Sequence, residues 1–186
     1  MKDPKVNGTK VVFGPCRLSY THLFSKYVGE GQEDGKYQTA VLIPKSETKT
    51  LEAIKQALNA AIEAGVSSKW GGKKPAKLET PIKDGDEKDD EVYAGHYYFN
   101  AKSSTRPGIV DKYGSPITDE EEIYSGVWCY VSVNFFPYKA SGNCGVSAGL
   151  NNVMKFKDDD HLGGRSSAAT DFDGFGEDVA NDDFFG

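Results

Sequence analysis

The chain has 186 residues, of which 38% are apolar, and a formal net charge of −6. This length favours one domain with a tail over two domains. No apolar run approaches the ~20 residues that cross a bilayer, and the opening MKDPKVNGTK lacks the apolar stretch of a signal peptide, so we expect a cytoplasmic protein with no membrane partner.

Charge is divided unevenly along the chain. Residues 171–186, DFDGFGEDVANDDFFG, carry six carboxylates and no Lys or Arg, whereas the first 170 residues hold 22 acidic and 22 basic side chains. Two further acidic clusters, at 84–91 and 119–122, lie in segments that we expect to be loops. The negative net charge therefore does not exclude nucleic acid as a partner, because the remaining surface is distinctly basic.

The predicted elements begin with two strands, at 9–14 and 36–45, which are short and rich in β-branched residues. An amphipathic helix follows at 48–64, and Gly65 is placed to end it. Residues 66–92 are first basic and then acidic, without apolar periodicity, and we expect a long loop there.

Three more strands are predicted at 96–104, 126–138 and 145–157, which makes five, enough for a small barrel. After residue 157 the composition becomes small and polar, and then acidic. We therefore place a mainly β folded domain at 5–157, with one helix between strands two and three, and a flexible acidic tail at 158–186.

The fourth predicted strand has two apolar faces. Alternate residues form one face that can line a core: Val127, Cys129, Val131, Val133 and Phe135. The other face carries the rings of Trp128, Tyr130 and Phe136. Either a second layer covers these rings, such as the helix or another subunit, or they form an exposed platform.

Aromatic and basic residues alternate closely at several places, a pattern that single-strand binding without sequence preference requires. Bases stack on rings for ~1–3 kcal/mol each, and cations contact the phosphates. The stacking candidates are Trp70, Tyr98, Trp128 and Tyr130. The phosphate-binding candidates are Lys36, Lys69, Lys73, Lys74, Lys102, Arg106 and Lys139. The alternative is a structural or scaffolding protein whose aromatic face is a subunit contact.

The sequence contains two apparent functional motifs, a nucleophile elbow and a metal site, but the context of each argues against that chemistry. GVSAG at 145–149 matches the nucleophile elbow, with Ser147 as nucleophile and His161 downstream, but the elbow needs a strand that turns into a helix. Asp158, Asp159 and Asp160 beside His161 are better explained as a solvated acidic run than as a metal site. The three cysteines, at 16, 129 and 144, form no C-x-x-C pair, and we expect reduced structural thiols. We predict no enzyme activity, cofactor or metal.

Four stretches resemble a family of phage and prophage proteins long known only as a domain of unknown function. They are RPGIVD (106–111), GSPI (114–117), IYSG (123–126) and, most specifically, GVSAGLNNV (145–153). The resemblance covers most of residues 5–157. It implies an OB-type barrel and a non-catalytic protein that binds single-stranded DNA during phage DNA replication, recombination or repair.

The end of the chain resembles the acidic, aromatic-tipped tails of bacterial and phage single-strand binders. The resemblance implies that the tail competes with DNA for the basic groove and docks replication or recombination proteins. The residues that would do so are Asp182, Asp183, Phe184 and Phe185. A disordered tail that only solubilises the protein is the alternative. We also expect a homodimer, because linked barrels favour cooperative coating of a strand.

Overall fold

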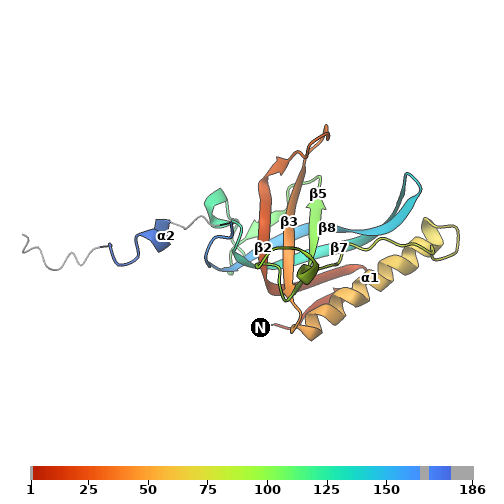
Figure 1. The fold of residues 1–186 in the computed structure, drawn as a ribbon, viewed down its shortest axis with the longest axis horizontal. Helices are drawn as coiled ribbons and strands as arrows, with labels where there is room; N and C mark the ends of the chain where they lie inside the picture. The colour runs from red at the N-terminus through yellow and green to blue at the C-terminus, as the bar shows by residue number, and fades with distance from the viewer. Residues whose placement is uncertain (1, 164–167, 177–186) are drawn as a thin grey trace, which may run out of the picture.

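Five long strands close into a barrel in the computed structural model, which describes residues 2–163 and 168–176 (Figure 1). They are β2 (Lys10–Tyr27), β3 (Lys36–Pro44), β5 (His96–Ser103), β7 (Trp128–Ala140) and β8 (Asn143–Lys157). Around the barrel the order is β2, β3, β5, β8, β7 and back to β2, and only the β5–β8 pair is parallel. This order, with α1 (Thr48–Ser68) between the second and third strands, confirms the predicted OB-type fold.

Short elements extend the barrel at its edges. β1 pairs with β2, β4 with β5, and β6 with β8. The bounds of the short elements are β1 (Lys5–Asn7), β4 (Lys83–Asp84), η1 (Gly85–Glu87), β6 (Gly108–Val110), η2 (Glu120–Glu122) and α2 (Ala168–Asp171). None of them was predicted, because such short segments carry no usable hydrophobic period. No helix within the two described ranges is long and apolar enough to cross a membrane.

The first barrel strand is much longer than its predicted span of 9–14. β2 changes partner along its length, pairing first with β7 and then with β3. The register with β7 shifts around Gly14, where a Cβ would lie 2.8 Å from the carbonyl oxygen of Cys129. The prediction stopped there because the Gly14-Pro15 pair is typical of a turn that ends a strand. The other four strands lie within two residues of their predicted ends.

Aromatic rings from three strands fill the barrel. Phe13, Phe99 and Phe135 are fully buried, and ring centroids lie 6.3 Å apart for Phe13–Phe99 and 5.8 Å apart for Phe99–Phe135. The apolar face predicted for the fourth strand lies in this core: Val127, Cys129, Val131, Val133 and Phe135. Burial raises the pKa of Cys129 to about 12, so this thiol stays protonated and acts as a small apolar side chain.

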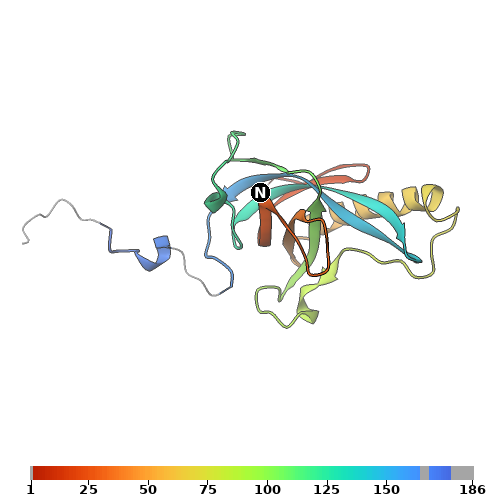
Figure 2. The same cartoon turned by 90° about the horizontal axis from the view of Figure 1, so that it is seen from above.

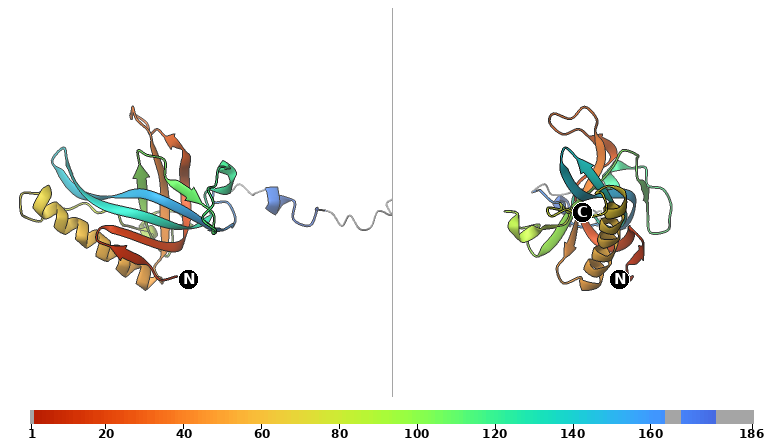
Figure 3. Two further views of the ribbon diagram at one scale, coloured as in Figure 1. Left: turned by 180° about the vertical axis from the view of Figure 1, so that it is seen from behind. Right: turned by 90° about the vertical axis from the view of Figure 1, so that its right-hand side faces the viewer.

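Helix α1 packs along the outside of the barrel, mainly against β7 (Figure 3). Its buried face includes three small residues, Ala53, Ala57 and Ala61. The helix was predicted to end at Gly65 but continues to Ser68. Gly65 is needed for space, because a Cβ there would lie 2.6 Å from Trp70 Cη2 and 2.7 Å from Pro137 Cβ. Glycine at this position therefore marks a close contact rather than the end of the helix.

The predicted long excursion between α1 and β5 runs back along the outside of the barrel (Figure 2). Glu79 pairs with Gly145 of β8, and β4 pairs with β5. Lys45 holds the acidic part of the excursion, with Nζ 2.7 Å from Asp84 Oδ1 and 2.6 Å from Asp86 Oδ2. These contacts fix the segment against the barrel, and they bring Lys83 alongside β5.

Replacing Gly65 with Ala should destabilise the protein, although helix propensity alone favours Ala by about 1 kcal/mol. The added methyl group meets Trp70 and Pro137, and overpacking of this kind costs about 1–3 kcal/mol. We expect a lower Tm in thermal unfolding followed by circular dichroism. Asn59→Ala, at an exposed position of the same helix, is the control and should leave Tm unchanged or raise it. A Tm of Gly65→Ala at or above that of the parent protein contradicts the packing argument.

Candidate nucleic-acid interface

A groove of about 380 Å³ lies on the outside of the barrel, where the β2–β3 and β7–β8 hairpins flank β5 (Figure 1). We call it the hairpin groove. Its polar and aromatic lining includes Lys36, Lys83, Asn100, Lys102, Phe136 and Tyr138. These side chains come from β3, β4, β5 and β7, so the closed barrel is needed to assemble them.

Three lysines give the hairpin groove its positive charge. Lys36 begins β3 and donates from Nζ to Ser104 Oγ at 3.0 Å. Lys102 faces outward from β5, because its neighbour Ala101 is buried in the core. Lys83 is held beside β5 by the β4 pairing. Within the described residues none of the three lysines forms an ion pair, so their charges are available to an anion.

Two rings of β7 form one wall of the hairpin groove. Phe136 is 43% exposed although Phe135 is buried, because successive strand residues face opposite sides. Tyr138 donates its hydroxyl to Glu79 Oε2 at 2.9 Å. Desolvation and this hydrogen bond raise the pKa of Tyr138, so the phenol stays neutral. Glu79 is the one acidic side chain among the lining residues.

The GVSAG segment of β8 leaves room for these rings. Gly145 pairs with Tyr138 across the ladder, and a Cβ at Gly145 would lie 2.6 Å from Tyr138 Oη. A Cβ at Gly149 would make an ordinary contact with Phe136, 3.5 Å from its Cε1, so the close approach that requires glycine is the one at Gly145. β8 continues as a regular strand beyond this motif, so Ser147 does not sit on the strand-to-helix turn of a nucleophile elbow. The motif serves ring packing.

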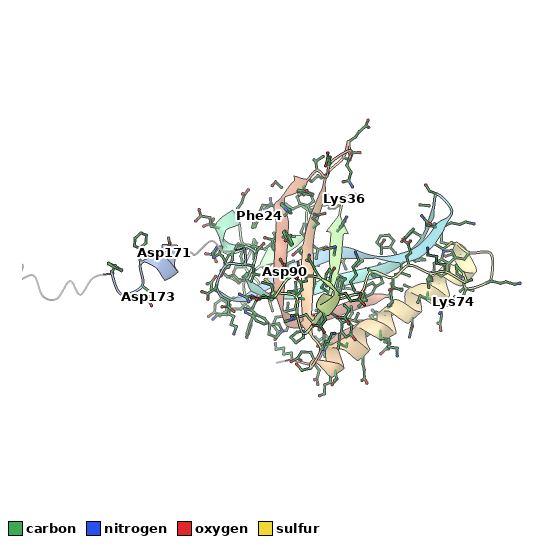
Figure 4. The ribbon with its side chains drawn as sticks, viewed as in Figure 1. Phe24, Lys36, Lys74, Asp90, Asp171 and Asp173 are labelled. Carbon is green, nitrogen blue, oxygen red and sulfur yellow. The ribbon has the colours of Figure 1, made fainter. Side chains whose placement is uncertain are left out.

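The structure brings some of the predicted phosphate contacts together and separates others. Lys36 and Lys102 both line the hairpin groove. Four other lysines are exposed around the end of α1 and the β7–β8 hairpin: Lys69, Lys73, Lys74 and Lys139. Arg106 stacks on β2, with its guanidinium carbon 5.2 Å from the ring centre of Phe24. Figure 4 shows Lys36 near the β2–β3 hairpin and Lys74 beyond the end of α1.

Trp70, predicted to stack on bases, is a core residue instead. It is only 8% exposed, its ring packs on Gly65, and its Nε1–H donates to the Tyr138 carbonyl at 3.1 Å. A ring enclosed in this way has no face to offer a base. The flanking glycines and lysines indicated a surface loop, and the sequence held no sign that the indole turns back to the barrel.

Tyr98 lies half-buried beside the hairpin groove. Lys83 pairs with Tyr98 and lines both the groove and the adjoining hollow that contains Tyr98. The rings of Tyr93 and Tyr98 meet edge to face, with centroids 4.8 Å apart, and Lys88 Nζ lies 5.4 Å from the Tyr98 ring centre. Of the four predicted stacking residues, Tyr98 is therefore the one adjoining the groove.

Trp128 and Tyr130 lie outside the hairpin groove. Trp128 donates its Nε1–H to Asp159 Oδ2 at 2.7 Å, and Lys157 Nζ lies 5.4 Å from its ring. Tyr130 lines a separate apolar groove. The rings on the second face of this strand, which either a second layer or a ligand was expected to cover, are thus divided between different surfaces.

Residues 158–163 stay on the barrel, past the boundary expected at residue 157. Their hydrogen bonds run from Tyr124 Oη to Asp158 Oδ1, from Arg17 Nη2 to the Asp160 carbonyl and from Leu162 N to the Ser125 carbonyl. His161 stacks on Tyr124, with ring centroids 4.0 Å apart. The acidic run is therefore hydrogen-bonded to the barrel, although the side chains of residues 158–160 remain exposed to solvent. The predicted tail residues lie outside the described residues: Asp182, Asp183, Phe184 and Phe185.

Sequence reasoning did not select Phe136, Tyr138 or Lys83 as site residues. The sequence could have identified Phe136 as a stacking candidate, because this residue shares the second face of the strand with Trp128 and Tyr130. That pattern does not show which end of the strand meets the cations. Lys83 had no signal, since it sits in the long excursion whose path depends on distant pairings.

Comparisons with known proteins find relatives over nearly the whole chain. Residues 9–185 match the model of a family described as the single-stranded-DNA-binding protein of Enterobacter phage Enc34. A putative protein p50 from Acyrthosiphon pisum secondary endosymbiont phage 1 is 35% identical over 175 residues, covering 88% of this chain and 92% of that protein.

Two solved structures are also similar. The single-stranded DNA-binding protein from bacteriophage Enc34, in complex with single-stranded DNA, aligns with a TM-score of 0.77 and 26% identity, covering 88% of this chain and 95% of that chain. The single-stranded DNA-binding protein gp2.5 of bacteriophage T7 aligns with a TM-score of 0.57 and 18% identity, covering 85% of this chain and 97% of that chain. The second similarity concerns the fold alone.

The contact between Asp159 and Trp128 should open in acid. The hydrogen bond from Trp128, the backbone N–H of Asp160 and the nearby Arg17 lower the pKa of Asp159. Because the pKa of Asp159 is lowered in the folded protein, its ionised carboxylate stabilises the fold fully at pH values above the ordinary Asp pKa of about 4. This stabilisation is lost as the pH falls through the lowered pKa. We expect tryptophan fluorescence to change as the pH falls below about 4. Asp159→Asn should lack this transition, and identical profiles for the two proteins contradict the assignment.

Proposed function

Because the chain belongs to the Enc34 family of phage single-stranded-DNA-binding proteins, we propose that it coats exposed single strands during phage DNA replication, recombination or repair in the host cytoplasm. The observation that carries this proposal is the hairpin groove, where an exposed ring shares one surface with lysines that form no ion pair among the described residues. That pairing suits a strand whose bases are unstacked and whose backbone is anionic.

In this proposal each part of the nucleotide meets a different wall of the groove. Lys36, Lys83 and Lys102 contact phosphates, and the exposed face of Phe136 stacks on a base. Tyr98 offers a second ring beside Lys83. Rings accept any base, so the binding is independent of sequence.

The basic residues around the groove extend the path of the strand. The lysines near the β7–β8 hairpin continue it on one side: Lys69, Lys73, Lys74 and Lys139. Arg106, stacked on Phe24, continues it toward β2. Trp128 and Tyr130 lie off this path, and their predicted stacking on bases stays a prediction.

The acidic segment 171–186 acts in this proposal as a competitor of DNA and a docking element for replication or recombination proteins. It has six carboxylates and four phenylalanines, and the family match extends into it, to residue 185. Carboxylates can occupy the lysines that phosphates would otherwise contact. A homodimer that links two grooves on one strand would add to the affinity through effective concentration.

Phe136→Ala should weaken binding to a short oligo-dT by about 5- to 150-fold, because a stacked base contributes about 1–3 kcal/mol. The measurement is a fluorescence anisotropy titration at fixed salt. Tyr113→Ala is the matched control, since Tyr113 is 82% exposed and lies outside the groove. Both variants should keep the Tm of the parent protein. Equal affinity losses in the two variants would remove Phe136 from the binding site.

Deleting residues 171–186 should strengthen oligo-dT binding at equal salt and leave Tm unchanged. In both proteins the logarithm of the binding constant should fall linearly with the logarithm of salt concentration. The expected slope is about −0.7 for each phosphate that the protein contacts on a single strand. Titrations at several salt concentrations provide the measurement. Unchanged or weaker binding after the deletion contradicts competition by the tail. An affinity that is insensitive to salt favours the scaffolding alternative.

A further inference from the structure

A second groove, of about 420 Å³, lies on another part of the barrel and shares no lining residue with the hairpin groove. We call it the Tyr130 groove. It crosses neighbouring strands and is mostly apolar, with a lining that includes Val12, Val110, Tyr130, Val153, Met154 and Phe156. Its size is within the range of ligand sites, about 300–1,000 Å³, which recognise their ligands through an apolar floor and a few polar groups.

Strand register gives the floor of the Tyr130 groove an apolar row and a polar row. In the apolar row Tyr130 of β7 lies opposite Met154 of β8, which pairs with Val110 of β6. In the neighbouring row Ser132 of β7 lies opposite Asn152 of β8, and both residues line the groove. A hydroxyl and an amide offer both donors and acceptors. A planar group with polar edges, such as a nucleobase, can therefore lie on the apolar row and form hydrogen bonds beside it.

Ring surface is open to a ligand at the apolar row. A Cβ at Gly14 of β2 would lie 2.9 Å from Tyr130 Cδ1, so glycine at this position leaves space for the ring. Phe156 is 45% exposed, and its ring meets Tyr130 edge to face, with centroids 5.8 Å apart and planes at 83°. Edge-to-face geometry leaves ring surface free, and a nucleobase can stack on such a surface.

Cations lie at two edges of the Tyr130 groove. The strands across it follow the order β1, β2, β7, β8 and β6. Lys5 belongs to β1 and Lys112 follows the end of β6, so these two lining residues lie at opposite edges. Neither lysine forms an ion pair among the residues described. Asp3 also lines the groove, but its Oδ1 lies 3.3 Å from Lys49 Nζ, so the groove offers positive charge to a ligand.

The separation of the two edges indicates the kind of ligand. Neighbouring strands lie about 4.8 Å apart, so the four steps from β1 to β6 span about 19 Å along the surface. A single phosphate group cannot contact cations at both edges. The successive phosphates of an extended strand can do so, with a base on the rings between them. The arrangement therefore fits single-stranded nucleic acid better than a free nucleotide.

We propose that the Tyr130 groove is a second binding site for single-stranded DNA, so that one protomer holds two segments of strand at once. Lys5 and Lys112 contact phosphates, and a base stacks on Tyr130 and Phe156. The proposal rests on the proposed function for the identity of its ligand. It does not rest on the hairpin groove, because no residue lines both grooves and Tyr130 lies about 20 Å along β7 from Phe136.

Photocrosslinking of the full chain to a short oligo-dT tests this proposal. One thymine of the oligonucleotide is replaced by 5-iodouracil, which crosslinks to aromatic side chains on irradiation, and the crosslinked peptides are mapped by mass spectrometry. We expect crosslinks at Tyr130 or Phe156 in addition to those at Phe136. A calorimetric titration at low salt should show two oligonucleotides bound per chain, a ratio that does not depend on dimer formation.

Reversing the charge at both edges provides the matched comparison. Lys5→Glu combined with Lys112→Glu should lower the crosslink yield at the Tyr130 groove several-fold, because the edges then repel phosphates, and should leave the yield at the hairpin groove unchanged. Lys55→Glu combined with Lys77→Glu makes the same charge change outside both grooves and should leave the yield at the Tyr130 groove unchanged. All four substitutions are at exposed positions, and equal Tm values check that folding is intact.

Three results overturn the proposal. The first is crosslinks at the hairpin groove alone, with one oligonucleotide bound per chain. The second is a yield at the Tyr130 groove that falls equally in the edge pair and the control pair. The third is loss of crosslinks at both grooves in Phe136→Ala, which should lower only those at the hairpin groove.

The same crosslinks separate a failure of this proposal from a failure of the proposed function. Crosslinks at Phe136 without any at Tyr130 or Phe156 contradict the second site and leave the hairpin groove as the binding site. Crosslinks at Tyr130 or Phe156 without any at Phe136 support the second site and contradict the role of the hairpin groove.

Discussion

The short parallel contact between β5 and β8 is the interaction on which the hairpin groove depends. It pairs Ala101 with Ala148 and Lys102 with Gly149, and it closes the barrel. Lys102 of β5 and Ala148 of β8 both line the hairpin groove, so this pairing brings residues of the two strands to one surface. Phe136 of β7 lines the same groove and pairs with Ser147 of β8. The contact between β5 and β8 therefore shapes the surface as well as closing the barrel.

Local charge explains why a protein with a net charge of −6 carries a basic groove. Several acids are already bound within the fold. Asp84 and Asp86 hold Lys45, and Asp159 accepts from Trp128 beside Arg17. The lysines of the hairpin groove have no such partners among the residues described. A ligand therefore meets the unpaired cations, whereas the net charge counts every acid equally.

The strands were predictable because alternation is a local property, and the buried face of β7 follows it residue by residue. The second half of β2 was not predictable, since its pairing with β3 follows a register shift after Gly14. The end of α1 was missed because Gly65 serves a contact with Trp70, and that contact joins the helix to a loop beyond it. Long-range packing decided each of these positions.

The candidate site, like the fold, was predictable only where local sequence determines it. Lys36 and Lys102 were identified from the rings beside them in the sequence, and both line the groove. The choice between Phe136 and Tyr130 could not be made from alternation, because both rings occupy the same face of the same strand. Only the closed barrel places Phe136 beside β5 and Tyr130 beside β6.

The length of β7 explains how one face of one strand contributes to several surfaces. β7 has 13 residues, and a strand rises about 3.3 Å per residue, so its ends lie about 40 Å apart. A strand of that length twists around the barrel and meets different neighbours along its course. Trp128 at its start meets Asp159, Tyr130 meets Phe156, and Phe136 meets the lysines of the hairpin groove. One strand of this length therefore contributes rings to separate surfaces of a small barrel, and only the ring that reaches the lysines of the hairpin groove can pair a stacking face with those cations.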